Sequence, residues 1–160
     1  MSKLEPRRPK QSSIRRSVSD AYYSVFHLLV EEGGQLLFSG ATVKKDVRDL
    51  ASRSFGHGQM KEVFTNIARQ NRNIQNHKFN KYFPGPIPFE IREIAIIFIE
   101  LQKARHDADY NTAVNHKRNR ALDAIEKAEF VFSHWNSLKV NNQAAATNLV
   151  GLLLFPERNK

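Results

Sequence analysis

The chain of 160 residues carries no cysteine and has a large positive charge. Its length suits a single domain, and a composition of 41% hydrophobic and 26% charged residues is that of a globular protein with an apolar core. Without cysteine, disulfide bonds, thiolate zinc sites and cysteine nucleophiles are excluded. The apolar runs are too short to span a bilayer, and the basic N-terminus lacks the apolar stretch of a secretory signal. We therefore expect a cytoplasmic protein that uses no membrane, metal or organic cofactor.

The formal net charge of +9 predicts an anionic partner, because clustered lysine and arginine side chains attract phosphate groups. The first 16 residues contain six basic residues and one acidic residue. Pro6 and Pro9 lie in the same stretch, which indicates a flexible basic tail over residues 1–12, followed by one domain over residues 13–156. This tail either contacts nucleic acid or only adds solubility.

Apolar residues between Ile14 and Leu29 recur every three or four positions, which predicts a first amphipathic helix. Ser12 or Ser13 is expected to cap its start, and the helix should end near Gly33 or continue as far as residue 38.

The polar side of this first helix is a candidate functional surface. His27 has a side chain that can transfer protons near neutral pH. Alternatively the surface is only solvated, with an ion pair between residues four positions apart. The stripe that an ideal helix places on this side consists of Arg16, Asp20, Tyr23 and His27.

Two short helices are expected next. The first covers residues 43–54 and should turn Val47, Leu50 and Ala51 inward, and the second follows over residues 60–67. A proline-rich stretch at residues 84–88 then prevents any helix from continuing, because proline lacks the amide proton.

The second half of the chain predicts a central helix and a further long one. The sequence is apolar nearly all the way round from Phe89 to Leu101, as expected of a helix buried in a bundle. A segment over residues 144–155 is either a short packing helix or a dimer contact. The sum is an all-α bundle of four principal helices with one or two short ones. The long helix, over residues 112–138, is expected to place on one side Leu122, Ile125, Phe132 and Trp135.

Residues 71–83 combine basic and aromatic side chains, which can bind single-stranded RNA through phosphate contacts and base stacking. Alternatively the aromatic rings cap the bundle and the lysines are only solvated. Arg72 and His77 also have the spacing of an arginine–histidine pair, although chance explains such a match easily. With two residues of the first helix, the candidate RNA or ligand contacts are Arg16, Tyr23, Arg72, His77, Lys78 and Lys81.

Two segments resemble the HEPN family. Residues 14–27 (IRRSVSDAYYSVFH) are similar to the first helix of many small HEPN domains, with a basic pair, a serine-containing stretch that ends in Ala-Tyr-Tyr, and a closing Phe-His. Residues 101–110 (LQKARHDADY) are similar to an Arg-x-x-Ala-Asp-Tyr segment of a minimal branch. The resemblance implies an up-and-down helical bundle, a homodimer and, in many members, metal-independent ribonuclease activity. It also implies a nucleotidyltransferase-type partner protein in toxin/antitoxin or defence systems.

The same resemblance implies a catalytic role for Arg105. In active members an arginine holds the scissile phosphate, and a histidine four to six positions later acts as acid or base. Here Asp109 stands where that histidine is expected, and a carboxylate repels phosphate. This departure argues against ribonuclease activity. The candidate catalytic residues are Arg105, His106, Asp109 and His27.

A structural role for Arg105 is the alternative. If the central helix continues, Arg105 shares the inward face with Leu101, and Asp109 follows one turn later. Because a buried arginine needs a partner, these two residues would form an ion pair in the bundle or at a dimer interface. Two hypotheses result: a HEPN-like domain of an RNA- or nucleotide-linked system, weak or inactive as a ribonuclease, or a non-enzymatic homodimeric interaction module.

Overall fold

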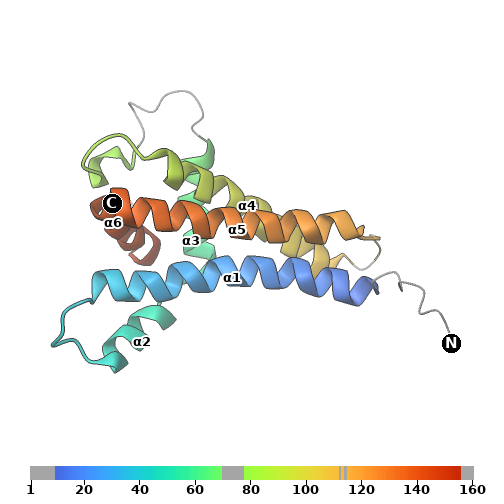
Figure 1. Ribbon diagram of the computed structural model, residues 1–160, viewed down its shortest axis with the longest axis horizontal. Coiled ribbons are helices and arrows are strands. Elements are labelled where there is room, and N and C mark those ends of the chain that lie inside the picture. Colours follow the sequence, from blue (N-terminus) through green and yellow to red (C-terminus); the bar gives the residue numbers. More distant parts are fainter. Residues whose placement is uncertain (1–9, 70–77, 112, 114, 156–160) are drawn as a thin grey trace.

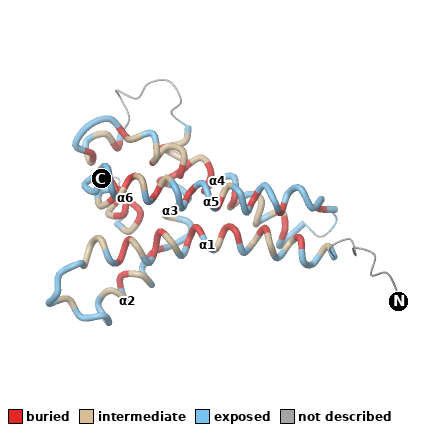
Figure 2. Tube along the Cα trace, viewed as in Figure 1, coloured by how far each residue is buried: buried red, intermediate tan, exposed pale blue. Residues whose placement is uncertain are grey.

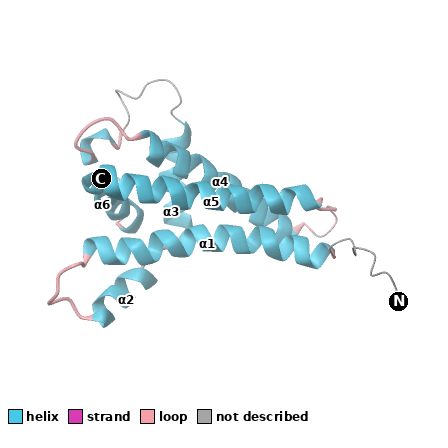
Figure 3. Ribbon diagram, viewed as in Figure 1, coloured by secondary structure: helices cyan, strands magenta, loops and turns pink. Residues whose placement is uncertain are grey.

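The computed structural model describes residues 10–69, 78–111, 113 and 115–155. Within these ranges every regular element is helical, which confirms the predicted all-α class (Figure 3). None of the helices described is long and apolar enough to cross a bilayer. In chain order the elements are α1 (Gln11–Leu37), α2 (Lys45–Arg53), α3 (His57–Arg69), the short 3₁₀ helix η2 (Asn80–Tyr82), α4 (Phe89–Tyr110), α5 (Arg118–Asn141) and α6 (Gln143–Leu154).

Three long helices, α1, α4 and α5, pack against one another along their lengths (Figure 1). Helix α4 runs antiparallel to both of the others, and the short α4–α5 connection lies near the start of α1. At the opposite end, α3 packs on α4, and α6 closes the bundle by contacting α1, α3 and α5. The side chains on the facing sides of α1 and α4 are therefore held in a fixed register.

The core follows the apolar stripes of these helices (Figure 2). On α4 the inward face of Ile91, Ile94, Phe98 and Leu101 is buried, as the sequence predicts. Burial of such side chains is the main favourable term in folding, because each removes a large apolar area from water.

Helix α5 buries a different face from the predicted one. Trp135 is fully buried, but Leu122, Ile125 and Phe132 are exposed by 52%, 41% and 38%. The small alanine side chains allow α5 to approach α1 and α4 closely, so the core register follows them instead of the larger residues. The buried stripe consists of Ala121, Ala124, Ala128, Val131, Trp135 and Leu138.

Helix α2 also differs from the expectation. Ala51 is buried, whereas Val47 and Leu50 are exposed by 44% and 60%. Helix α2 has only nine residues and packs on α1, where Gly34 allows close approach: a Cβ added there would lie 2.8 Å from Ser52 Oγ. One small residue is therefore enough to make the contact, and the larger apolar side chains of α2 face solvent.

The predicted helix ends need smaller corrections. Helix α1 begins at Gln11 after Lys10, which makes no side-chain capping bond, so Ser12 and Ser13 lie inside the helix. It continues through its two glycines to Leu37, in agreement with the longer of the two predicted ends, whereas α5 begins at Arg118, later than expected.

Replacing either of two glycines by alanine should change the stability of the fold, in opposite directions. A Cβ on Gly33 would lie 2.7 Å from Val150 Cγ1, whereas Gly151 in α6 has nothing within 4 Å of that position. Overpacking costs about 1–3 kcal/mol, and Gly→Ala in a helix gains roughly 0.5–1 kcal/mol. Urea unfolding should therefore show Gly33→Ala to be destabilised and Gly151→Ala to be stabilised. Equal effects at both sites would contradict the close α1–α6 contact.

Candidate functional site

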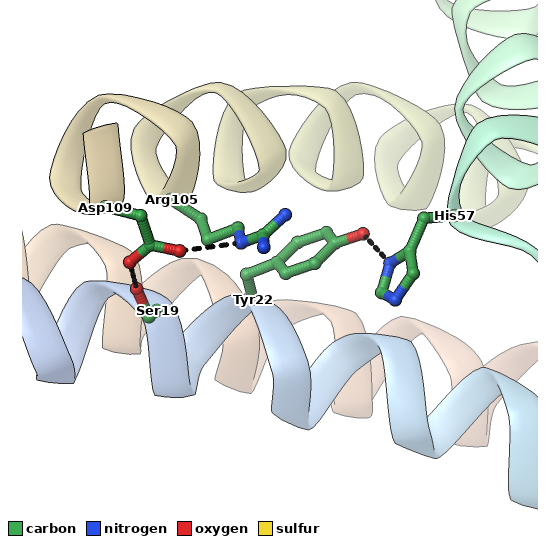
Figure 4. Close-up of polar contacts among 5 residues, drawn as sticks. All are labelled: Ser19, Tyr22, His57, Arg105 and Asp109. Carbon is green, nitrogen blue, oxygen red and sulfur yellow. Dashed lines mark hydrogen bonds and ion pairs between the residues drawn. The ribbon is translucent and has the colours of Figure 1, made fainter. Parts of the chain in front are cut away.

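A polar cluster lies between α1 and α4, next to the first residue of α3 (Figure 4). We call it the Arg105 cluster, and the figure shows the hydrogen bonds that connect its members. Helix α1 contributes two side chains, α4 contributes two and α3 contributes one. The members are Ser19, Tyr22, His57, Arg105 and Asp109.

Arg105 and Asp109 form the ion pair that their spacing predicts. The distance from Arg105 Nε to Asp109 Oδ2 is 3.0 Å, and Ser19 Oγ donates a 2.6 Å hydrogen bond to Asp109 Oδ1. The two charged side chains are 21% and 31% exposed, so the pair is partly open to solvent rather than fully buried. The carboxylate of Asp109 accepts from both Ser19 and Arg105. These two hydrogen bonds fix the carboxylate, which in turn holds the guanidinium in place.

The guanidinium of Arg105 also lies over two aromatic rings. Its Cζ is 5.6 Å from the ring centroid of Tyr22 and 5.2 Å from that of Tyr23, within the range of cation–π attraction. Asp109 uses only Nε, and no acceptor among the described residues contacts the terminal nitrogens. Two forked donors are therefore available to an anion from outside.

Tyr22 connects this arginine to a histidine. The ring of Tyr22 is buried, and its hydroxyl lies 2.6 Å from Nδ1 of His57. Burial raises the pKa of Tyr22 to about 12, although the Gln102 hydrogen bond and the Arg105 charge act in the other direction. The phenol is thus protonated at neutral pH. With the hydroxyl assigned as donor to Nδ1, its oxygen remains free to accept from Gln102, and His57 carries its proton on Nε2.

His57 belongs to the site although its sequence context does not single it out. Its ring stacks on Phe26, with centroids 3.8 Å apart and planes 13° apart, while the residue as a whole is exposed. Partial burial lowers the pKa of His57, and the charge of Arg105 and then His27 add to the effect. The neutral imidazole is therefore favoured at pH 7.

His27 lies on the same side of α1. Its ring stacks with Tyr23 at a centroid distance of 6.3 Å, and Tyr23 meets His57 edge-on at 6.0 Å. Two imidazoles thus flank one tyrosine, beside the guanidinium that covers the same ring. His27 itself is exposed.

Other predicted site residues lie apart from this cluster. Among the described residues Arg16 pairs only with Asp20, at 3.8 Å on an exposed surface, and His106 packs against Tyr110 with ring centroids 4.9 Å apart. Helix geometry turns His106 away from Arg105 by about 100°. Of the predicted set, Arg105 and Asp109 belong to the cluster, and Tyr23 and His27 lie against it through ring contacts, whereas Arg16 and His106 lie apart.

The basic aromatic segment is described only in part. Lys78 and Lys81 are exposed, and each ammonium group lies over the ring of the next residue, at 4.7 Å and 4.9 Å from the centroid. The two rings belong to Phe79, which is buried, and Tyr82, which is partly buried. Arg72 and His77, the second predicted arginine–histidine pair, lie outside the described residues.

The described part of the chain contains no group of three or more histidine, aspartate or glutamate side chains that could hold a metal ion.

Comparison of the chain with protein-family models, with curated proteins and with solved structures found no match. The chemistry at and beside the Arg105 cluster is that of one arginine with two available donors, two imidazoles and an aromatic surface.

The lowered pKa of His57 predicts a pH-dependent contribution to stability. In the unfolded chain the pKa returns to about 6.5, so the unfolded state binds more protons as the pH falls. Stability that is present above pH 6.5 should be lost progressively as the pH falls through that value towards the folded-state pKa. Urea unfolding at pH 7.5 and pH 5.0 should show a smaller difference for His57→Gln than for the parent chain. Equal differences in the two chains would contradict a lowered pKa of His57 in the folded state.

Proposed function

We propose that the chain is a HEPN-like RNA-binding domain, in which the Arg105 cluster contacts the phosphate backbone and ribonuclease activity is weak or lost. The observation that carries the proposal is the Arg105 guanidinium, held by Asp109 over Tyr22 and Tyr23 with its terminal donors available. Guanidinium forks bind phosphate oxygens with two parallel hydrogen bonds. The net charge of +9 adds long-range attraction to the same ligand.

The histidines suit binding better than catalysis. His57 accepts at Nδ1 from Tyr22, so its Nε2–H is a donor and can hydrogen-bond a phosphate oxygen. The same assignment prevents Nε2 from accepting the proton of a ribose 2′-hydroxyl, so of the two imidazoles beside Arg105 only His27 could act as a base. Asp109 further opposes charge that would develop on a phosphate during cleavage. Binding without fast cleavage is therefore expected.

The aromatic side chains of the cluster fit single-stranded RNA. Tyr23 is partly buried and lies between His27 and the guanidinium of Arg105, so an unpaired base can approach a surface that already combines rings and positive charge. Stacking of this kind tolerates any base. The resemblance adds the expectation of an RNA- or nucleotide-linked toxin/antitoxin or defence system with a nucleotidyltransferase-type partner.

The experiment is incubation of purified protein with labelled total RNA, with and without EDTA. RNA should be retained at physiological salt, retention should be lost in Arg105→Ala, and cleavage should be slow or absent under both conditions. Arg53→Ala, at the exposed end of α2, serves as the control for loss of one positive charge. Failure of the parent protein to retain RNA would contradict the proposal. Rapid EDTA-resistant cleavage that depends on Arg105 would instead establish a ribonuclease.

A helical homodimer is the second candidate function, and one surface favours it. Leu122, Ile125 and Phe132 are exposed on α5, and two of them border a groove of about 700 Å³ between α1 and α5. Apolar side chains at the groove include Ala21 and Ala128. Contiguous exposed apolar surface of this kind marks interaction sites, and we propose a second copy of the chain as its occupant.

Ile125→Lys tests the homodimer. Placing a lysine at Ile125 in the interface should convert a dimer into a monomer, because the ammonium group loses its hydration when it is buried. Sedimentation equilibrium measures the mass. Leu50→Lys, on the exposed side of α2, is the matched control and should leave the mass unchanged. A parent chain that is monomeric at all concentrations tested would contradict the dimer.

A further inference from the structure

A polar cleft lies between α4 and α5, with a volume of about 380 Å³. Lys103 and Asp107 border it on α4, where Arg105 does not, so it is separate from the Arg105 cluster. Val18 and Ala104 belong to its apolar lining. The proposed contact with RNA uses none of its charged side chains, which are Glu100, Lys103, Asp107, Arg120, Asp123 and Lys127.

His116 is the buried polar residue that lines this cleft. It is only 2% exposed, although it lies in the connection between α4 and α5. The side-chain amide of Gln11 holds it from both sides: Gln11 Nε2 donates to the His116 carbonyl at 2.8 Å, and the His116 amide donates to Gln11 Oε1 at 2.9 Å. The backbone of His116 is therefore held by the first turn of α1.

The contact with Arg120 determines the tautomer of His116. Arg120 Nη1 lies 3.2 Å from His116 Nδ1, and a guanidinium can only donate, so Nδ1 must be the acceptor. The ring proton is then on Nε2. Nε2 is buried, and it meets no acceptor among the residues that the structure describes. Buried donors are nearly always hydrogen-bonded, so this one indicates a missing acceptor.

The charges along the cleft are distributed unevenly. Towards the middle of α5, Lys127 pairs with Glu100 at 2.9 Å and with Asp123 at 3.0 Å, so its charge is compensated. Near the α4–α5 connection, Arg120 contacts His116, and neither Arg120 nor Lys103 forms an ion pair within the described part of the chain. This end of the cleft has two cations available.

We propose that this end of the cleft binds a small oxyanion, a phosphate or a carboxylate, which accepts from His116 Nε2–H and pairs with Arg120 and Lys103. An oxygen of such a group is the acceptor that the buried donor lacks, and two cations compensate its charge. Asp107 borders the same end and opposes the anion, so the site favours a ligand of low charge. The proposal is independent of the RNA-binding function.

Nuclear magnetic resonance of the histidine ring nitrogens tests the proposal on the full chain. Inorganic phosphate and acetate are added in separate titrations at constant ionic strength, so the two arms distinguish a phosphate site from a carboxylate site. A saturable shift of the His116 Nε2–H signal is expected with at least one ion. Arg120→Gln should weaken this binding by about tenfold or more, because it removes a charged donor.

The matched control is Arg118→Gln, an exposed arginine two positions earlier on α5 that does not border the cleft; the affinity of this variant should equal that of the parent chain. Lys103→Gln is the second variant, should Arg120→Gln fail to fold, and it should also weaken binding. The absence of a saturable shift with both ions would overturn the proposal. Equal loss of affinity in Arg118→Gln and Arg120→Gln, or similar shifts at all histidines, would overturn it as well.

Discussion

Trp135→Ala is expected to lower the free energy of unfolding by about 3–5 kcal/mol, the range for removing a large aromatic side chain from a core. Trp135 is fully buried on α5, the helix that packs against both α1 and α4. Its indole Nε1 also donates a 3.2 Å hydrogen bond to Glu32 Oε2 on α1. The substitution therefore creates a cavity and removes one link between α1 and α5.

Urea unfolding followed by circular dichroism measures this loss. Trp135→Phe should cost less than the alanine variant, because much of the ring is kept and Lys139 still pairs with Glu32. Leu122→Ala, on the exposed side of the same helix, should change stability by only about 0.5 kcal/mol. Equal losses for Trp135→Ala and Leu122→Ala would show that the register of α5 is wrong.

Arg105→Ala is expected to weaken binding of single-stranded RNA by about 10- to 100-fold. A hydrogen bond to a charged group contributes roughly 1.5–3 kcal/mol, which corresponds to that range of affinity. The slope of log affinity against log salt should also fall by about one phosphate contact. Arg105→Lys should restore only part of the affinity, because an ammonium group cannot form the forked contact.

Fluorescence anisotropy with a labelled oligonucleotide measures both quantities. Because the arginine side chain is partly exposed, the alanine variant should keep the helical signal and the unfolding midpoint of the parent. Such values exclude loss of folding as the cause of weaker binding. The control Arg53→Ala should reduce affinity only slightly. Equal losses in the two variants would mean that the net charge, and not the Arg105 cluster, binds the RNA.

The helical class and the register of α4 could be predicted from sequence because large apolar residues mark them clearly. Ile91, Ile94 and Phe98 recur at helical spacing in line with Leu101, and Asp109 follows Arg105 at the spacing of one helical turn. The register of α5 could not be predicted in this way. Its core stripe begins with alanines, which carry little hydrophobic signal and are selected by how closely the helices pack.

The histidines show the same limit for the candidate site. His27 lies on the polar side of the predicted first helix, and its stripe with Tyr23 follows from helical periodicity alone. His57 joins the cluster only because α3 packs on α4 and directs its first residue at Tyr22. No local spacing predicts the contact of His57 with Tyr22 or that of His116 with Gln11. The two partners lie 35 and 105 positions away in the chain.

The most direct test of the Arg105 cluster as a phosphate site is one anisotropy titration of the same RNA with the parent chain, Arg105→Ala and Asp109→Asn. Asparagine keeps a side-chain oxygen that can accept from Arg105 Nε but lacks the negative charge that repels phosphate, so Asp109→Asn should bind about three- to tenfold more tightly. Arg105→Ala should bind more weakly than the parent. Weaker binding in both variants would contradict the account, because it would mean that the ion pair supports the structure and does not contact the ligand.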